Sequence, residues 1–188
     1  RRCAFTLTGA WAEKAHADAQ MFGEVDVLFD GSETGFTTLP EAGSLTVDPS
    51  CSYLHLTSNE TIGGLQWKEF PRTGDVPIVA DMSSDILSRP IDFTNFGLIY
   101  GGAQKNLGPA GVTVVIIRKD MLEAEAKGLP AYLRYSTHAS KQSLYNTPPV
   151  FSIWALSLVL RWIEKLGGLE AVVERNGMKS DLLYGVID

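Results

Sequence analysis

The sequence contains six short apolar runs, each flanked by turn-forming or polar residues. They begin at Cys3, Glu24, Ser52, Asp75, Phe96 and Val112. Runs of this length predict β-strands, and the last four are typical of strands buried on both faces of a parallel sheet. The segment "WAEKAHADAQMFG", between the first two runs, predicts an amphipathic helix closed by Gly23. Together these features predict a βαβ unit that opens an α/β domain.

Helical spacing dominates the end of the chain, where a long helix is predicted from Pro148 onward. Its large apolar side chains recur about one turn apart: Phe151, Trp154, Leu158 and Trp162. The apolar stretch 150–160 predicts that this helix is buried, and the glycines that follow Leu166 end it. A further helix is predicted from Leu169. A length of 188 residues leaves room for one good core, that is, for one domain and part of another.

Composition and cysteine spacing narrow the possible partners. A net charge of −6 disfavours a nucleic-acid partner, because binding to a phosphate backbone requires clustered lysine and arginine. The longest apolar stretch is shorter than the roughly 20 residues that a membrane-spanning helix needs. Cys3 and Cys51 fit neither a disulfide framework nor a zinc site. We therefore expect a cytoplasmic protein in a reducing compartment, with no metal, no membrane span and no nucleic-acid partner.

Polar side chains follow three of the predicted strands at the points where these strands end. Asn59 and Thr61 follow the third run, Asp81 ends the fourth, and Gln104 and Lys105 follow the fifth. Because ligands gather at the carboxyl ends of parallel strands, we expect a carboxylate and an amine to face one crevice. A partly desolvated lysine is an effective amine nucleophile, and Asp81 is placed to give a pyridinium nitrogen a fixed counter-charge. This pairing is the requirement of pyridoxal phosphate chemistry.

Two further features agree with a flat, phosphorylated ligand. Glycines at 101, 102, 108 and 111 surround Lys105 and permit a ring or a phosphate to approach the backbone closely. Trp11 lies just after the first predicted strand, where an indole can stack on a flat ring.

Each of these residues also has an ordinary structural interpretation. An aspartate after a strand is often a turn former or a helix cap, and a lysine among glycines can be a solvated loop residue. Trp11 can be a boundary aromatic that packs on the core. Neither a Walker A pattern nor GxGxxG accompanies the glycines, and no catalytic triad is visible.

Three longer segments point to a family. "ADMSSDILSRPID", "GLIYGGAQKNLGPAGVTVVIIRKDML" and "SLYNTPPVF" resemble, in this order, the phosphoserine aminotransferases, which are fold-type-I, class-V enzymes dependent on pyridoxal phosphate. The resemblance extends over essentially the whole chain but covers only part of the family's length. It implies a three-layer α/β large domain with a predominantly parallel, mixed sheet covered by helices.

The resemblance also implies roles for the residues at the strand ends. Lys105 matches the lysine that binds the cofactor covalently, and Asp81 matches the carboxylate that pairs with the pyridine nitrogen. Trp11 matches the aromatic side chain that stacks on the cofactor ring. Thr61 matches a hydroxyl near the phenolic oxygen, and Gln104 matches a contact near the cofactor phosphate.

Assembly and domain organisation follow from the same resemblance. Asn146 and Thr147 match residues that reach the cofactor phosphate of a neighbouring subunit, which implies a homodimer. Residues 1–188 correspond to a partial cofactor-binding large domain, in which 169–188 form a helix that leads toward a small C-terminal domain. The family's upstream phosphate-binding segment and its substrate-binding arginines have no counterpart in the sequence, so we expect little activity from this chain alone.

The implied reaction transfers an amino group from glutamate to 3-phosphohydroxypyruvate and yields phosphoserine and 2-oxoglutarate, on the route to serine and in some bacteria to pyridoxal phosphate. Two alternatives remain open from the residues. Another fold-type-I aminotransferase, specific for pyruvate, glyoxylate or serine, would share Lys105 and Asp81. A non-catalytic interaction or structural domain that has kept the fold would take up no cofactor.

Overall fold

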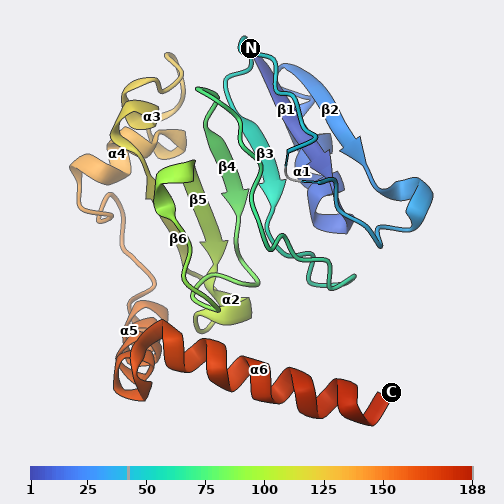
Figure 1. The fold of residues 1–188 in the computed structure, drawn as a ribbon. Coiled ribbons are helices and arrows are strands. Elements are labelled where there is room, and N and C mark those ends of the chain that lie inside the picture. Colours follow the sequence, from blue (N-terminus) through green and yellow to red (C-terminus); the bar gives the residue numbers. More distant parts are fainter. Residues whose placement is uncertain (42, 188) are drawn as a thin grey trace.

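The computed structural model, which describes residues 1–41 and 43–187, contains a six-stranded sheet (Figure 1). The strands are β1 (Arg2–Leu7), β2 (Glu24–Asp30), β3 (Leu54–Thr57), β4 (Ile78–Asp81), β5 (Phe96–Gly102) and β6 (Thr113–Ile117). Their order is β2-β1-β3-β4-β5-β6, and every neighbouring pair is parallel except β5 and β6. All six predicted strands are confirmed, in a mixed and mostly parallel sheet.

The helices connect and flank this sheet. They are α1 (Ala10–Ala19), α2 (Ala103–Asn106), α3 (Lys119–Glu123), α4 (Tyr135–Ser140), α5 (Val150–Leu166) and α6 (Gly168–Ile187), with 3₁₀ turns at Ser32–Thr34, Phe93–Asn95 and Ala131–Leu133. The predicted βαβ unit is confirmed, because α1 joins the parallel strands β1 and β2. The helix ends at Ala19 rather than at Gly23. Gly23 packs so closely on Arg1 that a Cβ would lie 2.3 Å from the Arg1 carbonyl oxygen.

The two faces of the sheet have different cover. On one face, Phe5 and its strand neighbours pack against α1. On the other, Leu56, Ile78 and Ile99 form the main core with Trp67, whose side chain is 1% exposed. The irregular segments that follow β3 and β4, rather than helices, supply most of this second cover.

The expectation of burial on both faces, made for the four later runs, is correct for β3 and wrong for the edge strand β6. All four residues of β3 are buried, whereas β2 and β6 contain only half-buried and exposed residues. An edge strand has a neighbouring strand on one side only. Its side chains are therefore exposed to solvent on the other side.

The expectation that α5 is buried is also wrong. The helix forms over the predicted residues and ends at Gly167 in the left-handed region, but none of its 17 residues is buried. Phe151 is 72% exposed and Trp154 is 55% exposed. The helix lies beside the carboxyl ends of the strands, next to α6, so that its Leu156 side alone adjoins the core (Figure 1). Among the helices that the structure describes, none is long and apolar enough to cross a membrane.

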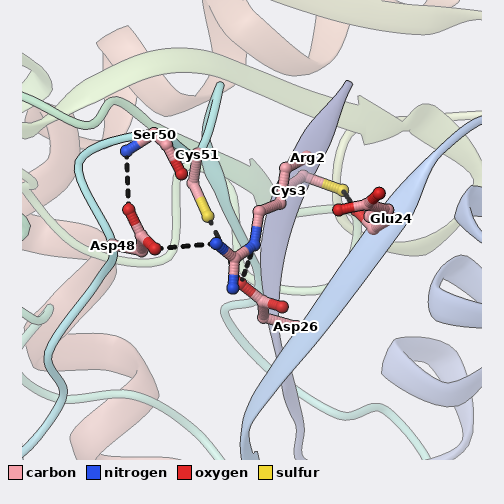
Figure 2. Close-up of polar contacts among 7 residues, drawn as sticks. All are labelled: Arg2, Cys3, Glu24, Asp26, Asp48, Ser50 and Cys51. Carbon is pink, nitrogen blue, oxygen red and sulfur yellow. Dashed lines mark hydrogen bonds and ion pairs between the residues drawn. The ribbon is translucent and has the colours of Figure 1, made fainter.

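An ion-pair cluster closes the opposite end of the sheet (Figure 2). Arg2 donates from Nε to Asp26 Oδ2 and from Nη1 to Asp48 Oδ2, each at 2.7 Å. The Cys51 thiol lies 3.7 Å from the same Asp26 oxygen. Burial of the thiol is the main cause that raises the pKa of Cys51, and the negative charge of Asp26 raises it further. Cys3 and Cys51 are both free and buried. The cluster ties the start of β1 to β2 and to the loop before β3, which is a structural role.

Candidate active site

The candidate site is built by the carboxyl ends of the three central strands. The register pairs Thr57 of β3 with Asp81 of β4, and Asp81 with Tyr100 of β5. The loop that carries Thr61 therefore begins beside Asp81. Helix α2 begins directly after β5, at the lower end of the sheet in Figure 1, and carries Lys105 in its single turn. Parallel topology thus brings three of the predicted residues to one edge of the sheet.

Lys105, Thr61 and Trp11 form the centre of this site. Lys105 Nζ donates a hydrogen bond to Thr61 Oγ1 at 2.7 Å. The same nitrogen lies 4.2 Å from the centroid of the Trp11 ring, within the range of a cation–π contact. Lys105 and Trp11 are half-buried and Thr61 is exposed, so the amine is held in place and remains accessible. Three segments far apart in the sequence therefore meet at this site.

A buried glutamate that the sequence analysis missed explains the position of Trp11. Glu60 is 1% exposed, and its carboxylate accepts hydrogen bonds from the backbone N–H of Trp11 (3.1 Å) and of Ala12 (3.0 Å). It therefore satisfies the amino end of α1, whose N-cap residue, Gly9, offers no side chain. Because Glu60 directly precedes Thr61, it also joins Trp11 to the loop that contacts Lys105. An uncapped helix start was the only sequence signal for it.

Removal of this carboxylate is expected to destabilise the fold. Glu60→Ala leaves the buried N–H of Ala12 and the partly buried N–H of Trp11 without their acceptor, and we expect the free energy of unfolding to fall by about 1–3 kcal/mol. Urea unfolding followed by circular dichroism measures this loss. Glu13→Ala is the matched control, since Glu13 is an exposed acid in the first turn of the same helix. Equal stability changes in the two variants would show that Glu60 does not hold the start of α1.

Asp81 lies at the end of β4 with one carboxylate oxygen engaged. Its Oδ1 accepts hydrogen bonds from the backbone N–H of Ser83 (2.8 Å) and from the Ser83 hydroxyl (2.6 Å). In the part of the chain that the structure describes, no hydrogen bond reaches Oδ2 and no ion pair joins Asp81 to Lys105. The turn-forming interpretation of Asp81 is thus correct, and it leaves one oxygen free for a ligand.

A neutral histidine lies behind Asp81 on the same face of the sheet. The ring of His55 stacks on Phe5 at a centroid distance of 4.5 Å, and its Nε2 lies 2.9 Å from the Tyr100 hydroxyl. Burial lowers the pKa of His55 to about 4, and the nearby carboxylate of Asp81 opposes this shift only in part. The imidazole therefore carries no charge at neutral pH, and the negative charge of Asp81 is not compensated from this side.

This lowered pKa predicts how stability changes with pH. Between pH about 6.5 and about 4 the unfolded chain protonates His55 while the folded chain does not, so the free energy of unfolding falls as the pH falls. We expect the contribution of His55 to this loss to reach about 3 kcal/mol at the acid end. Urea unfolding of the wild type and of His55→Gln across this range measures it. The variant should show the shallower dependence, and equal slopes would contradict the assignment.

The other predicted site residues lie outside this centre. Gln104 is exposed, and its side chain folds back over Gly102. Asn146 and Thr147 are exposed just before α5, and the Asn146 amide donates only to the Thr147 carbonyl, at 3.2 Å. Within residues 1–41 and 43–187, neither Asn146 nor Thr147 forms a hydrogen bond with Lys105 or Thr61. Their predicted contacts with a cofactor, including one in a neighbouring subunit, stay predictions.

The glycines near Lys105 have local structural roles as well. Gly111 adopts a positive φ of 101°, which disfavours a side chain. Gly108 faces the Leu156 backbone of α5, where a Cβ would lie 3.5 Å from the Leu156 Cα. These two positions therefore shape the turn after α2 and its packing on α5. Gly101 packs on the backbone of Ser83, because a Cβ added at Gly101 would lie 3.5 Å from the Ser83 Cα.

A cavity of about 720 Å³ lies elsewhere, at the amino ends of the strands between α1 and α3. The residues that line this cavity include Tyr53, Val79, Leu98 and Ile117. Lys105, Thr61 and Trp11 are not among them. We therefore do not assign the chemistry to it. Within the described ranges, no three His, Cys, Asp or Glu side chains are grouped so that they could hold a metal ion.

Residues 3–188 match the family model of the class-V aminotransferases. The chain belongs to the class-V aminotransferase family. Among relatives of the chain, a phosphoserine aminotransferase from Lysinibacillus sphaericus is 50% identical over 188 residues, which are 100% of this chain and 52% of that protein. The chain thus spans about half the length of the curated relatives it matches. The resemblance inferred from its segments is confirmed.

Solved structures agree with this family assignment. Phosphoserine aminotransferase from Bacillus circulans subsp. alkalophilus superposes on the chain with a TM-score of 0.97 at 50% identity, over 100% of this chain and 52% of that one. A PLP-bound phosphoserine aminotransferase from Trichomonas vaginalis gives a TM-score of 0.86 at 33% identity, over 100% and 56%. The predicted fold, that of the large domain of fold-type-I enzymes, is confirmed.

Proposed function

We propose that this class-V chain carries the cofactor-binding part of a phosphoserine aminotransferase, which transfers an amino group from glutamate to 3-phosphohydroxypyruvate with pyridoxal phosphate as cofactor. The products are phosphoserine and 2-oxoglutarate, in serine biosynthesis. One observation carries the proposal: the amine of Lys105 is held by Thr61 over the Trp11 ring, at the sheet edge where Asp81 ends β4. Phosphoserine aminotransferases that are 50% identical to the chain support this choice of substrate.

The residues at this edge fit pyridoxal phosphate. They combine a primary amine, a carboxylate with one oxygen free of hydrogen bonds from the described residues, and the face of an indole. When bound, the cofactor supplies an aldehyde that reacts with amines and a ring that accepts electrons from the substrate's Cα. Lys105 would hold it covalently, and Asp81 would keep a proton on the ring nitrogen.

The remaining work falls to the protein's own side chains. Thr61 accepts the hydrogen bond that orients Lys105 Nζ, and Trp11 excludes water from one side of that nitrogen. Once Lys105 is free, its Nζ is the base available at this edge to move the proton of the substrate's Cα. The neutral His55 leaves the charge of Asp81 uncompensated, so that this charge would be available to the ring nitrogen of a bound cofactor.

Assembly and location belong to the same proposal. Residues 1–188 would form part of the large domain, with α6 leading toward a small domain, because the matched relatives are about twice as long. Asn146 and Thr147, exposed before α5, would reach the cofactor phosphate of a second subunit in a cytoplasmic homodimer. The exposed aromatic side chains of α5 lie beside them and suit a position within an interface.

The arginines of the chain predict that residues 1–188 alone will not transaminate 3-phosphohydroxypyruvate. A phosphate and a carboxylate need fixed cationic partners, and arginine suits both. Arg2 and Arg118 are paired with aspartates, and Arg89 donates to backbone carbonyls. No arginine in the described ranges contacts Lys105, Thr61 or Asp81 through a hydrogen bond or an ion pair. We expect a rate at least about a hundredfold below that of the full protein, because substrate orientation is lost.

Substrate profiling tests the proposed function. The full protein, loaded with pyridoxal phosphate, is assayed with glutamate and each of 3-phosphohydroxypyruvate, pyruvate and glyoxylate, while residues 1–188 are assayed with the first acceptor. Preference for 3-phosphohydroxypyruvate is the expected result. Preference for another acceptor would move the protein to a different aminotransferase of the same fold type. Failure of the full protein to take up cofactor would favour a non-catalytic role.

A further inference from the structure

Ser83 joins the two halves of the candidate site, although the sequence analysis assigned it no role. Its hydroxyl lies 2.6 Å from Asp81 Oδ1 and 3.0 Å from the backbone nitrogen of Gly102. Gly102 is the last residue of β5 and the N-cap of α2, which carries Lys105. One side chain therefore contacts both the carboxylate at the end of β4 and the backbone at the start of the lysine-bearing turn.

The direction of these hydrogen bonds follows from the atoms themselves. The Gly102 N–H is only a donor, so the Ser83 oxygen accepts there and must use its own hydrogen toward Asp81 Oδ1. The backbone N–H of Ser83 donates to the same Oδ1 at 2.8 Å. Two donors thus converge on one carboxylate oxygen, which fixes the rotation of the carboxylate and leaves Oδ2 as the oxygen free to meet a ligand.

We propose that Ser83 is a positioning residue: it orients Asp81 against the turn that carries Lys105, so that Oδ2 is presented to the ring nitrogen of the cofactor. This inference rests on the proposed function. Ser83 is only 9% exposed, and Gly101 packs over its backbone, so the hydroxyl has little freedom to turn elsewhere. Solvation therefore does not explain the orientation of the Ser83 hydroxyl, whereas a fixed link between Asp81 and the turn that carries Lys105 does.

The adjacent serine supplies a matched control. Ser84 exchanges two hydrogen bonds with Asn59: its hydroxyl donates to the Asn59 carbonyl, and the Asn59 amide donates back to it, both at 2.8 Å. It has no hydrogen bond to Asp81 or Gly102 in the described residues. Ser84→Ala therefore removes a hydroxyl of similar surroundings, one residue away, without touching the link.

The test compares the affinities of two cofactors for the full protein, stripped of cofactor: pyridoxal phosphate, and 1-deazapyridoxal phosphate, in which carbon replaces the ring nitrogen. Quenching of tryptophan fluorescence reports binding in both cases. In Ser83→Ala we expect the dissociation constant of pyridoxal phosphate to rise about tenfold, the usual effect of a lost hydrogen bond to a charged group. The affinity for the deaza analogue should stay within about twofold, because it offers Asp81 no ring nitrogen.

Two variants complete the design. Ser83→Thr keeps the hydroxyl and should restore most of the preference for pyridoxal phosphate over the analogue, while Ser84→Ala should leave that preference unchanged. Equal losses for both cofactors in Ser83→Ala would show a general structural defect and overturn the positioning role, as would no loss at all. If the wild-type protein bound neither cofactor, the proposed function itself would fail, so the two failures are distinguishable.

Discussion

We expect Lys105→Ala to abolish the visible absorbance of covalently bound pyridoxal phosphate and to lower turnover by about a thousandfold or more. The variant loses both the amine that holds the cofactor and the base that moves the substrate's Cα proton, and positioned acid–base groups contribute about 10²–10⁴-fold each. Absorbance spectra and kcat of the reconstituted full protein measure the two effects. Thr61 and Trp11 remain in place, so weak non-covalent binding of the cofactor is expected to persist.

Lys14→Ala is the matched control for this prediction. The Nζ of Lys14 lies 4.7 Å from the Trp11 ring, nearly as close as that of Lys105, but Lys14 is exposed on α1 and comes from no strand end. We expect its removal to leave the spectrum and turnover essentially unchanged. If Lys14→Ala lost the absorbance and Lys105→Ala kept it, the site would be assigned to the wrong lysine.

The second large effect is expected for Asp81→Asn. The amide keeps the shape of the side chain, and its oxygen can still accept the hydrogen bonds from Ser83, but it cannot hold a proton on the ring nitrogen. We expect kcat to fall about 10²–10³-fold, the cost of removing one preorganised electrostatic group, with a smaller change in the KM for glutamate. Steady-state kinetics of the reconstituted full protein supply both constants.

Asp75→Asn is the control for charge alone, because Asp75 is exposed ahead of the same strand, at its amino end. It should leave kcat unaltered. Unimpaired turnover in Asp81→Asn, with the cofactor bound, would remove the electronic role of Asp81 from the account.

Local patterns in the sequence were sufficient to predict the strands and to find the polar residues at their ends. Asp81 was predicted because it ends one apolar run and Lys105 because it closely follows another, and parallel topology places such strand ends together. Glu60 and Ser83 were missed because their importance lies in hydrogen bonds to Trp11 and Gly102, which are distant in the sequence. The periodicity of apolar residues does not predict hydrogen bonds between residues that are distant in the sequence.

The wrong prediction for α5 has a different cause. Phe151 and Trp154 have the spacing of a buried helix, and the helix does form, but spacing reports which face is apolar and not what lies against it. A similar limit applies to Asn146 and Thr147. Their predicted partner is a second subunit, so residues within one chain carry no local signal of the contact.

The central claim, that Lys105 holds the cofactor, is tested most directly by trapping the bond. The full protein is loaded with pyridoxal phosphate and reduced with borohydride, and its peptides are mapped by mass spectrometry. We expect a stable pyridoxyl group on Lys105 alone among the eight lysines of this sequence, within "GGAQKNLGPAG". A modified Lys14 or another lysine, or no modified lysine in well-folded protein, would contradict it.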